Sequence, residues 1–515
     1  MKNVFWRKVD KVIVFVTLMN IGILMMFSLL FYPRFYSDMD ILMESAIYGI
    51  AGVRSSYIVF SNLLIGKMLT LLMDVVPMIP WYIVFHYICC FVSLWTIAFV
   101  ILKRNNTTMG KVLVGIILMF FGFECYVEPN YMKTAVLLCV SAMFLLFYLY
   151  KQGLCQRKLY KWLCLVPLYM LLSSMICFSA FLLSGISTLI FFVLYVIAHK
   201  CEKREFVLLL LLVAVIGILA LSVRVIDEKL YERSGNENVL SYRSSVEKVL
   251  LYGSPKSDDA FLKKYGMNEK QYEALKQGYF SNIDNTNLEL LKSISKEIKV
   301  LSFEMIKDFF RTVPISWFET GGMYYFVLLS FIYSLIGKGR KSVLCIAWGM
   351  VFVEYFVLYV CNAWDYKWIA FFVFVPASFY LFCYVKNLKS TEVKTVIVYV
   401  VVLSVVLYSK FSTEIASKVN KETMVSVYQD MDDLEANVWM MDMVEYLRGY
   451  SGFQIYEIPY VPEKVYWVNG TYGLIEPYAT WTYLQQKEEG KVYKWIYNPK
   501  KINLEMLFVY IGEEL

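Results

Sequence analysis

Apolar segments about 20 residues long recur along the whole chain and decide what it can fold into. A helix needs roughly 20 apolar residues to cross a bilayer, and the chain offers about eleven such spans. They lie at 12–32, 80–102, 111–127, 131–150, 160–176, 178–198, 206–226, 321–337, 342–361, 367–385 and 395–410. Because 59% of the residues are hydrophobic and only 18% are charged, the soluble globular classes are excluded. The sequence predicts an all-α polytopic membrane protein.

Clusters of Lys and Arg between the spans predict the topology. They lie at the N-terminus and in the loops 103–111, 151–161, 199–205, 337–341 and 386–394. Segment 57–76 is long enough to cross. However, all the clusters fall on the side of the N-terminus only if this segment lies in the interface, as the positive-inside rule requires. We therefore expect an interfacial helix at 57–76, the N-terminus inside and the C-terminus outside. The net charge of +7 then reflects topology, and no nucleic-acid partner is expected.

The spans divide the chain into four predicted regions. These are an N-terminal transmembrane module at 1–226 with its first outer loop at 33–79, an extracytoplasmic helical loop at 227–320, a C-terminal transmembrane module at 321–410, and a small extracytoplasmic α+β domain at 411–515. In the last region, 411–449 has a helical pattern. Strands are predicted at 454–458, 464–468 and 491–497, with a turn signal at Asn469-Gly470. Serines interrupt the pair 160–198, which could instead form a re-entrant hairpin without changing the topology.

Cysteines and histidines indicate neither disulfides nor a metal centre. The long polar segments 227–320 and 411–515 contain no cysteine, which suits a bacterial plasma membrane protein whose outer parts fold without disulfides. Cys89 and Cys90 are expected to pack as small hydrophobic side chains. The two histidines, His86 and His199, are too few for a His-rich metal site, and we expect both to be structural.

Acidic residues gather directly after the first span, in Ser37-Asp-Met-Asp-Ile-Leu-Met-Glu44. One interpretation is structural: Ser37 and Asp40 form a capping box, and acids in a first turn favour the helix dipole. Met39, Leu42, Met43, Ala46 and Ile50 would then form one apolar face opposite Asp40, Glu44 and Tyr48, as in a helix on the membrane surface. The other interpretation is catalytic, with Asp38 or Asp40 abstracting a proton from a hydroxyl group.

Further charged residues are predicted at the same membrane boundary. Arg54 and Lys67 belong to the first outer loop, the third span ends in Glu124-Cys-Tyr-Val-Glu128, and the fourth begins Asn130-Tyr-Met-Lys133. Cations at this depth can hold the phosphate of a lipid, or they can simply extend to the interface. Glu354 lies within a predicted span, where an ionisable residue has either a functional or a hydrogen-bonded structural role.

This arrangement resembles the GT-C superfamily of polytopic glycosyltransferases, which use polyprenyl-phosphate-linked sugars. The shared features are a first helix, an outer loop with the acidic motif Ser37-Asp-Met-Asp40, juxtamembrane helices and a C-terminal extracytoplasmic domain. The resemblance covers about the first 230 residues. It implies that Asp38 and Asp40 carry the general base, sometimes with a divalent metal such as Mg²⁺ or Mn²⁺. The C-terminal domain is far smaller than in the oligosaccharyltransferase branch. The chain also resembles a set of bacterial multi-pass membrane proteins without an assigned activity, through Tyr242-Arg243 and Tyr265-Gly-Met-Asn-Glu-Lys-Gln-Tyr272.

We therefore predict a GT-C-like enzyme that transfers a sugar from a lipid-linked donor to an envelope glycan or lipid acceptor. Asp38 or Asp40 would deprotonate the acceptor, and the residues that would contact substrate are Glu44, Arg54, Lys67, Glu128, Lys133 and Arg243. Two alternatives stay open. One is an O-antigen-type polymerase or ligase that relies on basic residues of 227–320, such as Arg243. The other is a non-catalytic transporter or scaffold of envelope assembly.

Overall fold

The structure is a computed structural model of the 515-residue chain, and it describes most of the N-terminal half. The described residues are 10–234 without 32, 36, 50–53, 59, 105, 152–159 and 200–202, together with 263–265, 289, 292–296, 306–307, 309, 341–360, 375–376, 438–441, 453, 465–467 and 493–497. Of the predicted spans, 321–337, 395–410 and nearly all of 367–385 lie outside this set.

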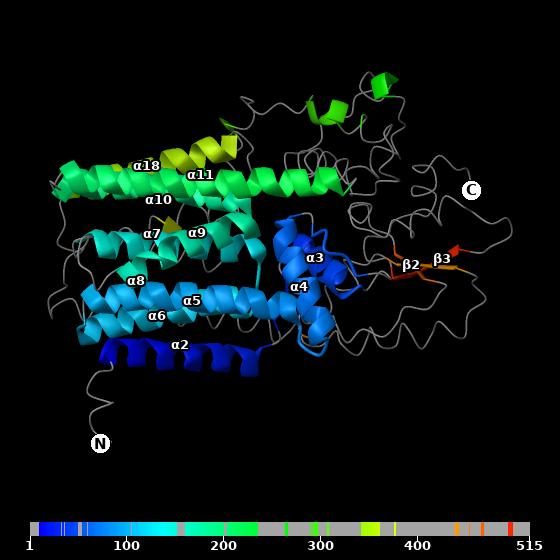
Figure 1. The fold of residues 1–515 in the computed structure, drawn as a ribbon, viewed down its shortest axis with the longest axis horizontal. Coiled ribbons are helices and arrows are strands. Elements are labelled where there is room, and N and C mark those ends of the chain that lie inside the picture. The colour runs from blue at the N-terminus through cyan, green and yellow to red at the C-terminus, as the bar shows by residue number, and fades with distance from the viewer. Residues whose placement is uncertain are drawn as a thin grey trace.

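The described part of the N-terminal module is a bundle of long helices (Figure 1). They are α2 (Lys11–Leu30), α5 (Trp81–Arg104), α6 (Thr108–Tyr126), α7 (Tyr131–Lys151), α8 (Tyr160–Leu163), α9 (Leu165–Ile176), α10 (Phe178–His199) and α11 (Lys203–Arg233), and α18 (Lys341–Val360) follows later in the chain. Each predicted span between 12 and 226, and the one at 342–361, coincides with a described helix, except that 160–176 is divided into α8 and α9. Among the described residues, three helices are long and apolar enough to cross a membrane: α2, α5 and the part of α7 up to Tyr150. The chain is therefore a multi-pass membrane protein.

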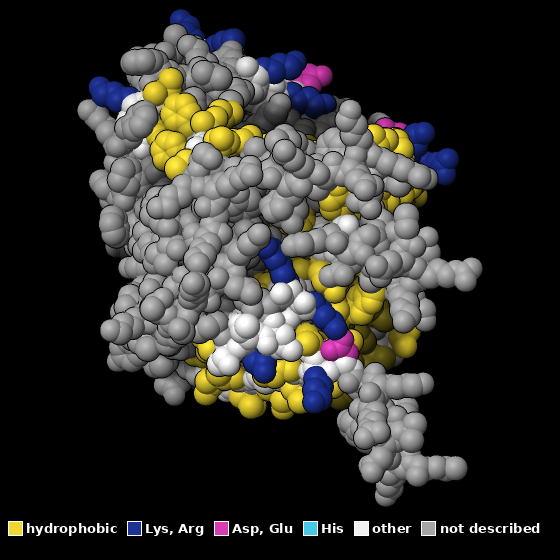
Figure 2. All heavy atoms as spheres, turned by 90° about the vertical axis from the view of Figure 1, so that its left-hand side faces the viewer, with side chains coloured by type: hydrophobic (Ala, Val, Ile, Leu, Met, Phe, Trp, Pro, Cys, Tyr) yellow, Lys and Arg dark blue, Asp and Glu magenta, His cyan; other side chains and the backbone are white. Residues whose placement is uncertain are grey.

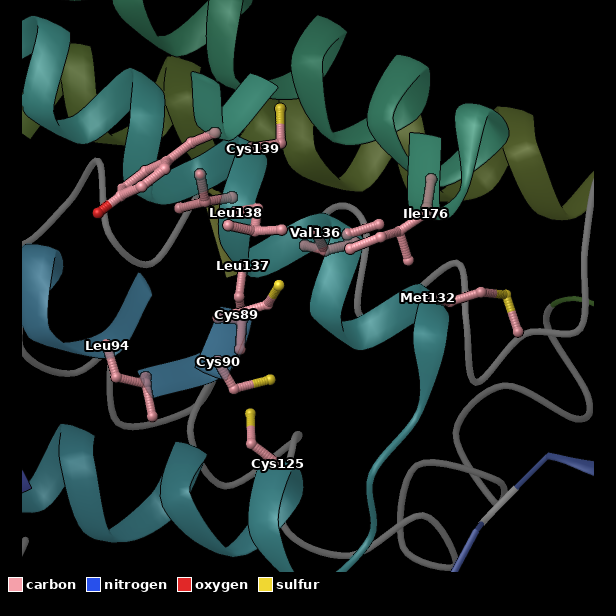
Figure 3. Close-up of a cluster of buried hydrophobic side chains, with 14 of the residues drawn as sticks. Cys89, Cys90, Leu94, Cys125, Met132, Val136, Leu137, Leu138, Cys139 and Ile176 are labelled. Atoms are coloured by element: carbon pink, nitrogen blue, oxygen red, sulfur yellow. The ribbon is translucent and has the colours of Figure 1, made fainter. Parts of the chain in front are cut away.

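Helix α7 forms the centre of the bundle, in contact with α5, α9 and α10. Its middle is buried on every side, from Ala135 through Leu146. Figure 3 shows part of this core, where side chains of α7 meet Cys89, Cys90 and Leu94 of α5. The two cysteines are buried and unbridged, so the prediction that they pack as small hydrophobic side chains is confirmed.

The basic loop 103–111, between α5 and α6, lies at the same end of the bundle as the start of α2 (Figure 1). Asp10 caps α2 by accepting a hydrogen bond from the N–H of Val12, and it also pairs with Lys103 at the end of α5. Lys111 of α6 lies over the ring of Phe15, 5.4 Å from its centroid. Figure 2 looks onto this end, and Lys and Arg side chains are visible both along its upper edge and in its lower half.

Two short helices lie at the other end of the bundle, side by side (Figure 1). They are α3 (Asp38–Tyr48) and α4 (Leu63–Val75), and both belong to the loop between α2 and α5. Helix α4 has 13 residues and is about 20 Å long, less than the roughly 30 Å of a bilayer core. It starts later than position 57, because Asn62 caps it by accepting from the N–H of Leu64 at 2.9 Å.

Three short strands represent the C-terminal region among the described residues. They are β1 (Val438–Met441), β2 (Val465–Trp467) and β3 (Tyr493–Tyr497), which form a parallel sheet of order β2-β1-β3. The strands predicted at 464–468 and 491–497 are confirmed. The helical prediction for 411–449 is wrong at β1, because a short apolar run pairs with two strands whatever its local periodicity. The predicted strand 454–458 and the turn at Asn469-Gly470 lie outside the described residues.

Candidate functional site

The acidic segment forms helix α3, and both of its ends have local causes. Ser37 is its N-cap and accepts a hydrogen bond from the N–H of Met39 at 3.2 Å. Gly49 ends it at a φ of 74°, a left-handed conformation that favours glycine. The cap predicted at Ser37 is confirmed. The carboxyl of Asp40 does not complete a capping box, because its hydrogen bonds go to other helices.

Asp40 is fully buried and accepts three hydrogen bonds. The hydroxyl of Tyr82, in the first turn of α5, donates to its Oδ1 at 2.8 Å, and the N–H of Tyr131, the first residue of α7, donates to the same oxygen at 3.0 Å. The side-chain amide of Asn130 donates to Oδ2 at 2.9 Å. One side chain therefore attaches α3 to both α5 and α7.

Burial controls the protonation of two acids of α3, Asp40 and Glu44. It raises the pKa of Asp40 to about 8, against the hydrogen bonds and the charge of Lys133, which favour the ionised form. Burial also raises the pKa of Glu44 well above its usual range. The Tyr48 hydroxyl one turn away opposes this rise, and the charge of Asp40 adds to it. Within the described part of the chain, neither oxygen of Glu44 has a hydrogen-bond partner of normal geometry.

Helix α3 is enclosed by protein, which corrects the expectation of a surface helix with its acids in water. Asp40 and Glu44 are fully buried, and so are Leu42 and Met43 on the predicted apolar face. The pattern of the sequence resembles that of an amphipathic helix. Asp40 nevertheless faces inward, because Tyr82 and the start of α7 supply the hydrogen bonds that a buried carboxyl requires.

Lys133 lies in a second buried group of charges beside the first. Its Nζ is 2.7 Å from a carboxylate oxygen of Glu124 and 3.6 Å from one of Glu128, and it also donates to the backbone carbonyl oxygens of both residues at 3.3 Å. The side chain of Lys133 is only 7% exposed. Its ammonium therefore joins the end of α6 to the start of α7, a role that competes with binding a substrate phosphate.

The cations of the first loop are more accessible. Arg54 pairs with Asp74 of α4 at 2.9 Å, and both side chains are exposed. Lys67 is also exposed, two turns before Asp74 on α4. The exposed apolar residues of the same helix are Leu64, Met68, Leu71 and Val75. This surface combines apolar side chains with two cations, as helices at a membrane interface do.

The surroundings of Asp40 do not fit a metal site. Its carboxyl is fully buried within the protein. Both oxygens of Asp40 already accept hydrogen bonds. Among the residues that the structure describes, no group of three or more His, Cys, Asp and Glu side chains could hold a metal ion. We therefore derive no step through Mg²⁺ or Mn²⁺.

The structure also describes the contacts of His86 and Glu354. His86 is buried, and its Nδ1 lies 3.0 Å from the hydroxyl of Thr134, so its structural role is confirmed. Glu354 of α18 accepts a hydrogen bond from Ser187 of α10 at 2.5 Å, which supports the structural interpretation of that residue. Arg243 lies outside the described residues.

The sequence did not identify Tyr82 or Asp227 as parts of this region. Tyr82 binds Asp40. Asp227 of α11 accepts a hydrogen bond from the N–H of Leu63. An available signal was Asp227 itself, an acid that directly follows an apolar span. Nothing in the local pattern singles out Tyr82.

Comparisons with known proteins identify no relative for this arrangement. No protein-family model matches the chain, and neither the curated proteins nor the solved structures contain a significant match.

Proposed function

We propose that this protein is a membrane glycosyltransferase that acts on the outer face of the membrane. It transfers a sugar from a polyprenyl-phosphate-linked donor to an envelope glycan or lipid acceptor. The topology that goes with this proposal has about eleven spans, the N-terminus inside and the C-terminal domain outside, in a bacterial plasma membrane.

One observation carries the proposal: the acid-bearing helix α3 is held at the end of the bundle by hydrogen bonds from two long helices. A carboxylate that only caps a helix needs no such partners. Asp40 instead accepts from Tyr82 of α5 and from Tyr131 and Asn130 at the start of α7. Fixing an acidic helix in this way supports a site, because catalysis requires groups held in one geometry.

The remaining roles are assigned from the chemistry of the side chains and, for the cations, from their accessibility. Asp38 or Asp40 is the general base, which takes the proton of an acceptor hydroxyl as that oxygen attacks the anomeric carbon. Lys67 and Arg54 hold the phosphate that leaves, because their side chains are exposed beside an apolar surface. Lys133 is a weaker candidate for the phosphate, since Glu124 and Glu128 already surround its ammonium.

A specific observation favours the non-catalytic transporter or scaffold as a second candidate. Ser187 and Glu354 form a polar contact between two apolar helices, α10 and α18. An ionisable side chain within an apolar membrane helix can mark a substrate or proton pathway. This contact already satisfies both side chains, so it carries less weight than the fixed acidic helix.

Donor turnover by the purified protein tests the proposal. The full chain in nanodiscs is incubated with polyprenyl-phosphate-linked sugars and with envelope glycans and lipids as acceptors, and release of the polyprenyl phosphate is followed by mass spectrometry. We expect release by the wild type. We expect Asp38→Asn to lower the rate by about 100-fold or more, as the loss of a general base does. Asp10→Asn, at the opposite end of the bundle, is the matched control and should leave the rate unchanged. Folded wild-type protein that neither binds nor consumes any donor would contradict the proposal.

A further inference from the structure

The geometry points to Asn130 as a positioning residue, whose side-chain amide fixes Asp40 and thereby holds the acidic helix α3 against α7. This inference rests on the proposed function, in which α3 carries the general base. It assigns different roles to the two aspartates. Asp40 holds α3 in place, and Asp38 is the general base of the proposed reaction.

The side-chain amide of Asn130 has a fixed orientation, because its oxygen and the backbone carbonyl both accept hydrogen bonds from the first turn of α7. Its Oδ1 accepts from the N–H groups of Met132 at 2.8 Å and Lys133 at 3.1 Å, which caps α7. Its backbone carbonyl accepts from the hydroxyl of Thr134 at 2.9 Å. The side-chain N–H₂ group therefore faces away from α7, and it donates to Oδ2 of Asp40 at 2.9 Å.

Both carboxyl oxygens of Asp40 are also engaged in hydrogen bonds. Its Oδ1 accepts from Tyr82 and from the N–H of Tyr131, and its Oδ2 accepts from Asn130. The residue is fully buried. A general base must present a free lone pair to the substrate. Because Asp40 is fully buried, a substrate hydroxyl could reach its carboxyl only if α3 moved away from the partners that hold it. Losing a partner inside a protein costs more than such a bond contributes net, so the arrangement favours a holding role.

The pair can be exchanged without losing a hydrogen bond. In the double variant Asp40→Asn/Asn130→Asp, position 40 keeps its oxygen toward Tyr82 and Tyr131 and turns an amide toward position 130. Position 130 keeps the oxygen that caps α7 and accepts from that amide. Each single substitution instead creates a mismatch. Asp40→Asn sets two N–H₂ groups against each other, and Asn130→Asp sets two carboxyl groups against each other.

Hydrogen exchange of the full-length protein in nanodiscs measures the attachment of α3 directly. We expect each single variant to speed exchange in the peptide covering residues 38–48 by about tenfold, the consequence of a buried polar mismatch. The double variant should return to within about threefold of the wild type. Unchanged exchange in both single variants, or a double variant with the two effects added together, would overturn the inference.

Two milder variants keep the test decisive if a single substitution prevents folding. Asn130→Gly removes the donor to Asp40 at a position where glycine is an acceptable N-cap, so α3 should exchange faster while α7 stays protected. Tyr82→Phe removes one donor to Asp40 and keeps the ring. Normal protection of α3 in both variants would overturn the inference.

Measuring sugar transfer by the same variants distinguishes a positioning role of Asp40 from a catalytic one. If Asp40 only positions α3, the double variant should recover transfer together with protection of α3. A double variant with restored protection and no transfer would show that the carboxyl of Asp40 contacts the reacting atoms, which contradicts the positioning role. If the wild type transfers no sugar, the proposed function fails, while hydrogen exchange still decides whether Asn130 holds Asp40.

Discussion

Asp227, near the end of α11, accepts a hydrogen bond of 2.8 Å from the backbone N–H of Leu63, the first residue of α4. The first N–H groups of a helix have no partner within the helix, and this one is buried beside a carboxyl that is only 2% exposed. A residue 164 positions away in sequence therefore fixes where the second helix of the first loop begins.

Removing this acceptor should release α4 from the bundle. Asp227→Ala leaves the N–H of Leu63 buried without its partner, at a cost of about 1–3 kcal/mol, whereas Asp227→Asn keeps an oxygen in place. We expect faster hydrogen exchange in α4 for the Ala variant only. Glu228→Ala is the matched control, because its exposed pair with Arg224 contributes little to stability. Equal exchange in the Ala and Asn variants would contradict this account of α4.

Gly66 is required by the close approach of α4 to the preceding loop. A Cβ at this position would lie 2.0 Å from the carbonyl oxygen of Ser56, and a backbone atom cannot move aside as a flexible side chain can. Gly66→Ala should therefore destabilise the protein by about 1–3 kcal/mol or more, measured by thermal unfolding in detergent. At Gly217 of α11 no atom lies within 4 Å of the added Cβ, so Gly217→Ala should be neutral or slightly stabilising. Equal effects of the two substitutions would argue against the close packing of α4.

The raised pKa of Asp40 predicts how stability depends on pH. The pKa of Asp40 is about 8 in the folded protein, against an ordinary value of 3.8, so the folded state binds more protons than the unfolded state between these limits. Stability should therefore fall as pH rises through this window, by up to about 1.4 kcal/mol per pH unit from this group. Asp40→Asn should show a shallower decline between pH 5 and 8 in denaturant unfolding. Identical slopes would mean that Asp40 does not titrate as a buried acid.

Most helices of the bundle could be predicted from the sequence to within a few residues, although α11 continues to Arg233, beyond its predicted end at 226. A run of about 20 apolar residues has few alternatives to a membrane helix, so the segment predicted at 131–150 became α7, Tyr131–Lys151. The start of α4, the second helix of the first outer loop, was predicted less well. Its apolar pattern extends back to position 57, but Asn62 and Asp227 supply the caps that start α4 at Leu63.

The candidate site shows where sequence reasoning stops. The acids of the first loop could be recognised because charge is rare in this chain. The orientation of α3 could not, because the partners that turn Asp40 inward are Tyr82 and Asn130, which lie 42 and 90 residues away. Local periodicity carries no information about contacts at such separations.

The contact between α10 and α18 offers a test of the transporter alternative. Glu354→Gln still accepts a hydrogen bond from Ser187, so we expect normal protein level and normal activity in cells. Ser187→Ala, which removes the donor, should weaken the contact by about 0.6 kcal/mol, the average for such bonds in a membrane. Loss of function in a folded Glu354→Gln protein would show that the carboxyl itself acts, and would favour a transporter.

The proposed topology can be measured by labelling introduced cysteines from outside intact cells. Thr107, between α5 and α6, and Met78, after α4, are both exposed. In a background without native cysteines, Met78→Cys should react with an impermeant reagent and Thr107→Cys should not. Reaction at both positions, or at Thr107 alone, would overturn the assignment of the two ends of the bundle.

Mass spectrometry of the cell-envelope glycans tests the central claim most directly. A deletion strain is complemented with the wild type, with Asp38→Asn or with Asp10→Asn, each at equal protein level. We predict that the deletion strain lacks one sugar from an envelope glycan or lipid, that the wild type and Asp10→Asn restore it, and that Asp38→Asn does not. An identical glycan profile in the deletion strain and the wild type, or full restoration by Asp38→Asn, would contradict the account.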